Sequence, residues 1–247
     1  SNSFCTLLVL TATPTLRNMS ATATAAPASS LQAELDAFKA QFVSQAPKEA
    51  LDIMTDATAQ VAASGIEKTG LQAGDKMPAF ELKDVQGAAH SSAALLAKGP
   101  LVVVFYRGGW CPYCNMQLRS YAKAFPQIAA AGASLVAISP EAPDFAAETS
   151  KSGDLPFPVL SDAGLDVERK FGLVFELTPE LQKVYDSFGI NLPARNGADK
   201  WELPLPAVFV VGADGVVATA HRPADYTIRK EPSAIVADLQ ALTGPKA

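Results

Sequence analysis

Several residue types are scarce in this chain, and each scarcity excludes a class of protein. The 247 residues include only three cysteines and two histidines, too few for the disulfide framework of a small secreted domain. No apolar run approaches the roughly 20 residues that are needed to cross a bilayer. Basic residues number 20 against 25 acidic ones, and this balance argues against a nucleic acid or an anionic membrane as partner. The length and the 49% hydrophobic content instead indicate one globular domain with extensions.

Two of the three cysteines stand together where a buried strand is predicted to meet a helix. The valine-rich run 101–106 is typical of a buried strand, and two glycines close it. The motif Cys-Pro-Tyr-Cys follows at positions 111–114, and apolar spacing together with the early proline predicts a helix over residues 112–131. Cys111 therefore falls at about the helix N-cap, and Cys114 lies one turn inside. Because a helix N-terminus stabilises a thiolate, this placement predicts a reactive dithiol.

Three interpretations of this cysteine pair are open: a packed or stapling pair, a zinc site, and a dithiol that undergoes redox chemistry. A zinc site needs further ligands, but the chain offers only Cys5, His90 and His221, which have no zinc-finger spacing. A Cys-x-x-Cys motif after a strand is typical of thiol–disulfide chemistry. Redox chemistry is therefore favoured, and no metal or other cofactor is expected. Helix geometry alone favours Cys111 as the attacking thiol and Cys114 as the resolving one.

The composition changes twice along the chain. Residues 1–29 are rich in Ala, Thr and Ser, with one basic residue and no acid, which predicts a disordered tail or a targeting segment. Residues 30–73 have helical apolar spacing and are expected to form an extension that packs on the domain or makes a homodimer contact. Residues 74–247 are expected to form the main domain. A reducing compartment suits the dithiol, so the expected location is cytoplasmic, or mitochondrial if residues 1–28 are a transit peptide.

Strands and helices are predicted to alternate in the main domain. The predicted strands are 80–82, which begins a hairpin with a turn at 86–87, then 101–106, 134–138, 207–211 and 216–219. The predicted helices are 93–97, 112–131, 144–150, 166–171 and 233–242, after a helical hairpin over 30–64. A strand–helix–strand beginning and an antiparallel hairpin end predict an α/β fold, with a mixed central sheet and helices on both faces.

Several segments together resemble one known family. The strand ending in Phe105-Tyr106, followed by Trp110 and the dithiol, is similar to the active-site segment of thioredoxin-fold proteins. Further matching segments are Gly74–Phe80, Pro158–Asp162, Phe171-Gly172, Pro206–Val210 and Asp214-Gly215. This combination resembles the alkyl hydroperoxide reductase/thiol-specific antioxidant (AhpC/TSA) group, the peroxiredoxin-like redoxins of the thioredoxin superfamily. The resemblance implies a thioredoxin-like fold and an antioxidant peroxidase.

The active-site segment also departs from that family. Peroxiredoxins resemble one another in a Pro-x-x-x-Thr/Ser-x-x-Cys motif. Aligned on the central strand, Arg107 takes the proline position, Cys111 the hydroxyl position and Cys114 the position of the attacking cysteine. The family's second arginine has no clear counterpart, because Arg169 is out of register. The resemblance therefore implies that Cys114 attacks and Cys111 resolves, so the two assignments of the cysteines stay open.

Four more residues are expected at the substrate groove. Arg107 either lowers a thiol pKa or lies at the surface. Trp110 and Tyr113 flank the dithiol and are expected to wall its groove. Pro206 stands where thioredoxin-like folds carry a cis proline that faces the dithiol, and it is expected to be cis.

The expected function is thiol-dependent reduction of hydroperoxides. A thiolate attacks the O–O bond, the sulfenic acid condenses with the neighbouring thiol to a disulfide, and a thioredoxin- or glutathione-type donor restores the dithiol. One alternative is a thiol–disulfide oxidoreductase that acts on protein disulfides without peroxide turnover. Another is a non-catalytic redox sensor. Turnover of peroxide separates the first interpretation from the other two.

Overall fold

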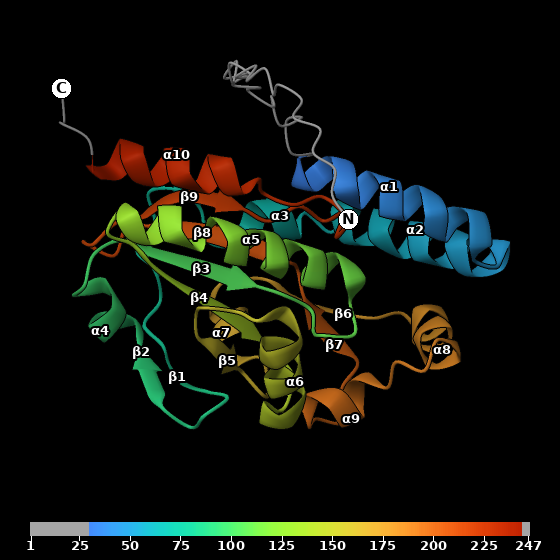
Figure 1. The fold of residues 1–247 in the computed structure, drawn as a ribbon. Helices are drawn as coiled ribbons and strands as arrows, with labels where there is room; N and C mark the ends of the chain where they lie inside the picture. The colour runs from blue at the N-terminus through green and yellow to red at the C-terminus, as the bar shows by residue number, and fades with distance from the viewer. Residues whose placement is uncertain (1–29, 244–247) are drawn as a thin grey trace, which may run out of the picture.

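The computed structural model describes residues 30–243 as an α/β fold built on a seven-stranded sheet (Figure 1). The strands are β1 (Glu81–Asp84), β2 (Ala89–Ser91), β3 (Leu101–Phe105), β4 (Ser134–Ser139), β5 (Val159–Ser161), β8 (Ala207–Val211) and β9 (Val217–His221). Their order is β2-β1-β5-β4-β3-β8-β9. β3, β4 and β5 run parallel, whereas the outer strands pair antiparallel with their neighbours. The predicted mixed sheet is confirmed. The expectations for residues 1–29, including Cys5, lie outside the described residues.

Side chains of the central strands alternate between two cores, as the period of a strand requires. Val102 and Val104 of β3 contribute to the core under α5 (Pro112–Ala130) and α10 (Pro232–Thr243). Val103 and Phe105 contribute to the opposite core, together with Phe171 and the short helices on that face. Those helices include α4 (Ser92–Leu96) and α7 (Asp166–Lys170), while α6 (Pro143–Gly153) packs beside α5. Helices therefore cover both faces of the sheet, as predicted.

Two helices precede the sheet and form the hairpin predicted over residues 30–64. They are α1 (Leu31–Gln45) and α2 (Lys48–Ala63), followed by the short α3 (Ile66–Thr69). Ser30 caps α1, because its side chain accepts a hydrogen bond from the Ala33 N–H. Leu31 and Leu35 are buried in the core beside α5. α1 is therefore packed on the domain at the end of α5 that carries the cysteines.

A segment between the sheet strands has no counterpart among the predicted elements. It contains β6 (Val174–Glu176), α8 (Pro179–Ser187), α9 (Leu192–Asn196) and β7 (Glu202–Pro204). β6 and β7 pair antiparallel as a separate two-stranded sheet, and α8 packs against α2. In Figure 1 the orange α8 lies below the blue α2. The segment and the N-terminal helices thus meet beside the cysteine-bearing end of α5.

Pro206 does not have the conformation that was expected of it. No peptide bond among residues 30–243 is cis, so the bond before Pro206 is trans. The trans form is the lower in energy unless the surroundings oppose it. Pro206 lies between β7 and β8, and the preceding Leu205 N–H donates to the Leu173 carbonyl.

None of the helices between residues 30 and 243 combines the length and hydropathy needed to cross a bilayer.

Candidate functional site

The dithiol sits on a short loop whose two glycines allow unusually close packing. Gly108 has φ +141°, and a Cβ there would lie 2.4 Å from the Trp110 indole nitrogen. A Cβ on Gly109 would lie 2.1 Å from Thr149 Oγ1. The Gly109 N–H donates to the buried carboxylate of Glu141 at 2.7 Å. The loop between β3 and α5 is therefore held closely against Glu141 and Thr149.

Cys111 occupies the N-cap of α5 and Pro112 its first turn, as the sequence predicts. Cys111 is 1% exposed and Cys114 is fully buried. Both thiols are free, so the structure shows the dithiol form of the pair. The helix N-terminus and the one-turn spacing that make a reactive dithiol are thus both present.

Arg107 lies beside the pair and is buried, not at the surface. Its guanidinium carbon lies 4.3 Å from the ring centroid of Tyr226 and 4.9 Å from that of Trp110. One guanidinium nitrogen donates to the hydroxyl of Tyr185 on α8. Among the described residues no carboxylate pairs with Arg107. Aromatic faces hold this cation, and they leave its charge uncancelled next to the thiols.

A second buried arginine reaches the dithiol from far along the chain. Arg229 is 4% exposed, and a guanidinium nitrogen lies 3.6 Å from Cys114 Sγ. Another of its nitrogens donates to Gln117 Oε1 at 2.8 Å. The ion pairs found between residues 30 and 243 do not include Arg229 either. Two cations without a carboxylate therefore flank the pair, and a thiolate is the anion that can balance them.

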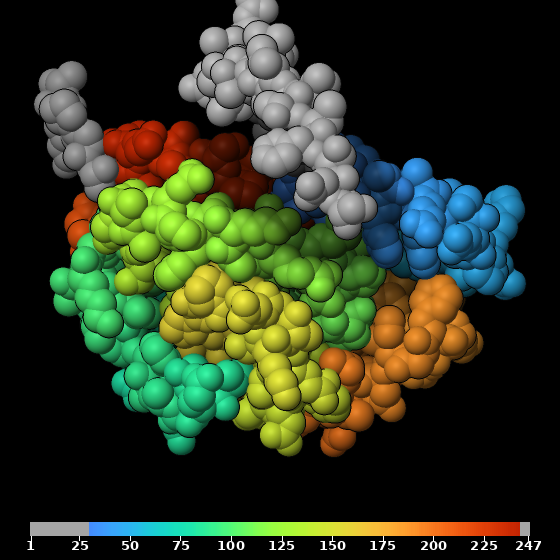
Figure 2. All heavy atoms as spheres, viewed as in Figure 1, coloured from blue at the N-terminus to red at the C-terminus, as the bar shows by residue number. Residues whose placement is uncertain are grey.

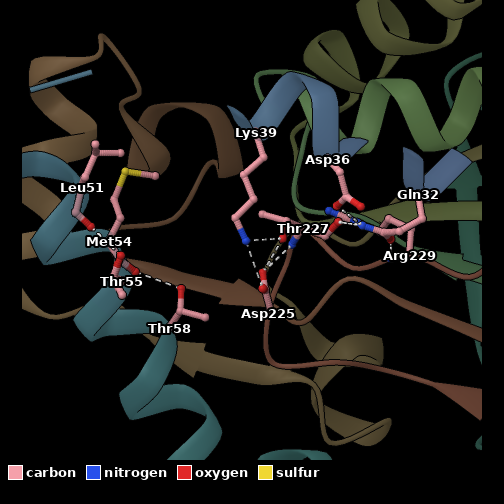
Figure 3. A network of polar contacts seen from close by, with 10 residues as sticks. All are labelled: Gln32, Asp36, Lys39, Leu51, Met54, Thr55, Thr58, Asp225, Thr227 and Arg229. Carbon is pink, nitrogen blue, oxygen red and sulfur yellow. Dashed lines mark hydrogen bonds and ion pairs between the residues drawn. The ribbon is translucent and has the colours of Figure 1, made fainter. Parts of the chain in front are cut away.

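Helix α1 fixes the loop that carries this second arginine (Figure 3). Gln32 accepts a hydrogen bond from the Arg229 N–H at 3.0 Å and donates to the Thr227 carbonyl at 3.3 Å. Lys39 donates to the Thr227 hydroxyl at 3.1 Å and lies 3.4 Å from the Asp225 carboxylate. The N-terminal extension is thus part of the site, because it positions a charge that acts on Cys114.

These charges act differently on the two thiols. Burial raises the pKa of the Cys111 thiol well above its ordinary value, and the neighbouring sulfur of Cys114 raises it further. Burial also raises the pKa of Cys114, but the hydrogen bond from Cys111 and the charges of Arg229 and Arg107 outweigh it and lower that pKa to about 5. The arrangement favours a thiolate on Cys114 and a proton on Cys111. This is the reverse of the assignment that helix geometry alone favours.

An apolar cavity of about 100 Å³ opens beside Cys111. Trp110 and Tyr113 both line it, as expected for walls of the groove. The Tyr113 ring makes edge contacts with Phe38 of α1 at 5.2 Å and with Tyr226 at 5.6 Å between centroids. Pro206 lines a neighbouring cavity, which shares Arg107, Tyr185 and Tyr226 with the first. Arg107, Trp110 and Tyr113 thus line the same cavity as Cys111, whereas Pro206 lines only the neighbouring one, and the roles of all four remain predictions.

Sequence reasoning missed three parts of this site: Arg229, Glu141 and the α8 residues around Tyr185. No local pattern marks Arg229, which stands 115 positions after Cys114. Arg169, the nearest candidate in sequence for a second arginine, instead pairs with Glu202.

The strand order, the parallel β3–β5 core and the helix that begins at the cysteine pair define a thioredoxin-like fold of the peroxiredoxin kind. A solved structure with the same fold, peroxidoxin BcpB from Mycobacterium tuberculosis, covers 70% of this chain and 99% of its own length, with a TM-score of 0.56 and 23% identity. The chain belongs to the AhpC/TSA family, whose family model matches residues 73–220.

Curated relatives share a shorter stretch of sequence. The chloroplastic peroxiredoxin Q of Populus jackii is 33% identical over 104 residues, which are 42% of this chain and 48% of the relative. The chloroplastic peroxiredoxin Q of Sedum lineare is also 33% identical over 104 residues, 42% of this chain and 55% of the relative. The chain therefore spans about half the length of these curated relatives. The helices α1 and α2 and Arg229 lie outside the residues that the family model matches.

Proposed function

We propose that this protein is a thiol peroxidase that reduces hydroperoxides with Cys111 and Cys114. Family membership supports the reaction class. The observation that carries the proposal is the pair of buried arginines, Arg107 and Arg229, which face the dithiol without a carboxylate among the described residues. A hydroperoxide needs a thiolate nucleophile and a stabilised leaving oxygen. Two uncancelled cations beside a buried thiol supply both.

In the proposed reaction, Cys114 is the attacking thiol. Its thiolate attacks the terminal oxygen of the hydroperoxide, the O–O bond breaks, and the alkoxide leaves and takes up a proton. Cys114 becomes a sulfenic acid. The Cys111 thiol then attacks the Cys114 sulfur, water leaves, and the disulfide forms. Cys111 is assigned the second role because burial and the neighbouring Cys114 sulfur raise the pKa of its thiol.

Arg107 is proposed to bind the peroxide oxygens, and Trp110, Tyr113 and Pro206 to wall the site. An external thiol of the thioredoxin or glutathione type completes the cycle by reducing the disulfide. We also propose that residues 30–73 form an extension, that residues 74–247 form the main domain, and that the protein is a homodimer.

Mass spectrometry of sulfenic acid tests the assignment of the cysteines. Cys111→Ser and Cys114→Ser proteins are exposed briefly to one equivalent of hydroperoxide and trapped with dimedone. We expect an adduct on Cys114 in the Cys111→Ser protein and almost none in the Cys114→Ser protein. The opposite pattern would make Cys111 the attacking thiol. Absence of peroxide consumption by the intact dithiol, together with reduction of a model protein disulfide, would favour the oxidoreductase alternative.

A further inference from the structure

The proposed reaction needs a source for the proton that the leaving alkoxide takes up. An alkoxide is a strong base, so a group that donates a proton while the O–O bond breaks accelerates the reaction. The cavity beside Cys111 is lined by three tyrosines: Tyr113, Tyr185 and Tyr226. Among the described residues, Tyr185 is the only one of the three whose hydroxyl is hydrogen-bonded to Arg107. This hydroxyl is therefore the candidate proton donor.

Helix α8 holds Tyr185 in a fixed position beside the dithiol. The residue is 4% exposed, and it packs in a small apolar cluster with Leu181 of α8 and Ala57 of α2. Its ring meets the ring of Trp110 edge to face, with centroids 5.4 Å apart. In Figure 2 the blue surface of α1 and α2 and the orange surface of the α8 region lie on either side of the end of α5. The α8 segment thus brings a buried hydroxyl to the end of α5 that carries the cysteines.

Arg107 connects Tyr185 with the attacking thiol. One terminal nitrogen of its guanidinium donates to the Tyr185 hydroxyl. The charge of the same guanidinium helps to lower the pKa of Cys114 to about 5, and the Arg107 backbone also hydrogen-bonds to Cys114. The tyrosine hydroxyl and the thiolate are therefore both neighbours of Arg107.

The guanidinium of Arg107 also has a donor that is not in use. Its Nε is buried and has no hydrogen-bond partner among residues 30–243. The nitrogens of a guanidinium form a rigid fork, so that oxygens bound to two of them lie close together. The Tyr185 oxygen already occupies one of these places. A peroxide oxygen bound at Nε would lie beside the tyrosine hydroxyl.

The Tyr185 hydroxyl has a proton available. Within the described part of the chain, its one hydrogen bond is the bond that it accepts from Arg107, and this bond does not use its own proton. Burial raises the pKa of Tyr185 above its ordinary value, although the charge of Arg107 opposes this shift. The hydroxyl therefore keeps its proton at neutral pH. Once the proton has been given up, Arg107 stabilises the phenolate that remains.

We propose that Tyr185 donates the proton to the leaving oxygen of the hydroperoxide. This inference rests on the proposed function for the reaction of the hydroperoxide with Cys114. The Cys114 thiolate forms a bond to the terminal oxygen, and the electrons of the O–O bond pass to the second oxygen. The Tyr185 proton moves to that second oxygen, and the alcohol leaves. The Tyr185 phenolate, which Arg107 holds, then takes a proton from solvent water.

The acidity of the leaving group tests this role. The oxidant tert-butyl hydroperoxide expels an alkoxide, which needs the proton, whereas peracetic acid expels acetate, which is stable without it. The reduced full chain is mixed with each oxidant and quenched rapidly, and mass spectrometry follows the loss of the free thiols at positions 111 and 114. We expect Tyr185→Phe to slow oxidation by tert-butyl hydroperoxide at least about tenfold, and oxidation by peracetic acid less than about twofold.

Two measurements separate proton donation from a structural effect. Tyr106 is also a buried tyrosine and precedes Arg107 in the chain, but it lines neither of the cavities that Tyr185 lines. Tyr106→Phe should therefore leave the rates with both oxidants unchanged. The rate at which iodoacetamide alkylates Cys114 should be the same in Tyr185→Phe as in the unmodified protein, because Arg107 keeps its charge.

An equal effect of Tyr185→Phe on the two oxidants would overturn the proposal, because it would show a general disturbance of the site. Full reactivity of Tyr185→Phe with tert-butyl hydroperoxide would overturn it as well. Failure of the proposed function gives a different result. In that case tert-butyl hydroperoxide does not oxidise even the unmodified dithiol, and the role of Tyr185 falls with that function.

Discussion

Removing the charge of Arg229 tests the electrostatic basis of the site most directly. Arg229→Met keeps much of the apolar stem and deletes a cation whose nitrogen lies 3.6 Å from Cys114 Sγ. At an effective dielectric constant of about 20, two unit charges at that separation interact by about 4–5 kcal/mol. One pKa unit corresponds to about 1.4 kcal/mol, so about 3 units is the upper limit of the change. Arg107 stays in place, and we expect the pKa of Cys114 to rise by about 1–3 units.

The thiolate absorbance at 240 nm, recorded against pH, measures this change. With a pKa of about 5, about nine-tenths of Cys114 is ionised at pH 6; a rise of 2 units leaves about one-tenth. The rate of alkylation by iodoacetamide at pH 6 should fall in about the same proportion. Arg119→Met provides the matched control, because Arg119 is an exposed arginine on α5, the helix that carries Cys114.

A single result would refute the electrostatic argument: an unchanged Cys114 titration in an Arg229→Met protein that remains folded by circular dichroism. A shift of equal size in Arg119→Met would refute it as well, since it would show that any loss of positive charge has this effect.

Three further predictions concern pH, the buried carboxylate and the active-site loop. Because the pKa of Cys114 is lowered to about 5, the second-order rate constant for hydroperoxide should be flat above about pH 6 and fall tenfold per unit well below pH 5, as stopped-flow oxidation would show. Glu141→Gln breaks a buried ion pair with Arg195 and should lower the free energy of unfolding, measured in urea, by about 2 kcal/mol. This loss is smaller than that expected for a fully buried ion pair, because Arg195 is partly exposed. Gly109→Ala places a Cβ 2.1 Å from Thr149 Oγ1 and should cost about 1–3 kcal/mol, with recovery in the Gly109→Ala/Thr149→Ala double variant; equal stability of single and double variants would contradict the clash.

The parts of the fold that were predicted correctly from the sequence are those determined by residues that lie close together in the chain. The valine run of β3 and the proline at the start of α5 set strand, turn and N-cap within about ten residues, and the structure has each of them where expected. The apolar spacing of α1 and α2 likewise predicted their hairpin. Local pattern could not supply Arg229, because its place beside Cys114 depends on the packing of α1 and the final loop.

The same limit applies to the two cysteines. Placing Cys111 at the N-cap was correct, but the N-cap is only one influence on thiol acidity. The hydrogen bond from Cys111 and the charges of Arg229 and Arg107 lower the pKa of Cys114. Local sequence patterns do not show that these two arginines lie beside the thiol. Arg107 has no carboxylate partner between residues 30 and 243, so its aromatic surroundings, contributed largely by α8 and the final loop, had to be seen in three dimensions. The trans bond before Pro206 shows that the cis proline typical of thioredoxin-like folds does not follow from a matching sequence segment alone.

The hydrogen bond between Gln32 and Arg229 has a consequence for how this chain and its relatives are compared. The stretch shared with the family runs from residue 73 to residue 220 and contains both cysteines, yet it omits the helix and the arginine that this bond joins. Excised at those limits, the shared stretch would keep both cysteines and lose Arg229, one of the two arginines whose charge lowers the pKa of Cys114. In this chain, residues outside the shared stretch therefore contribute to the acidity of Cys114 together with residues inside it.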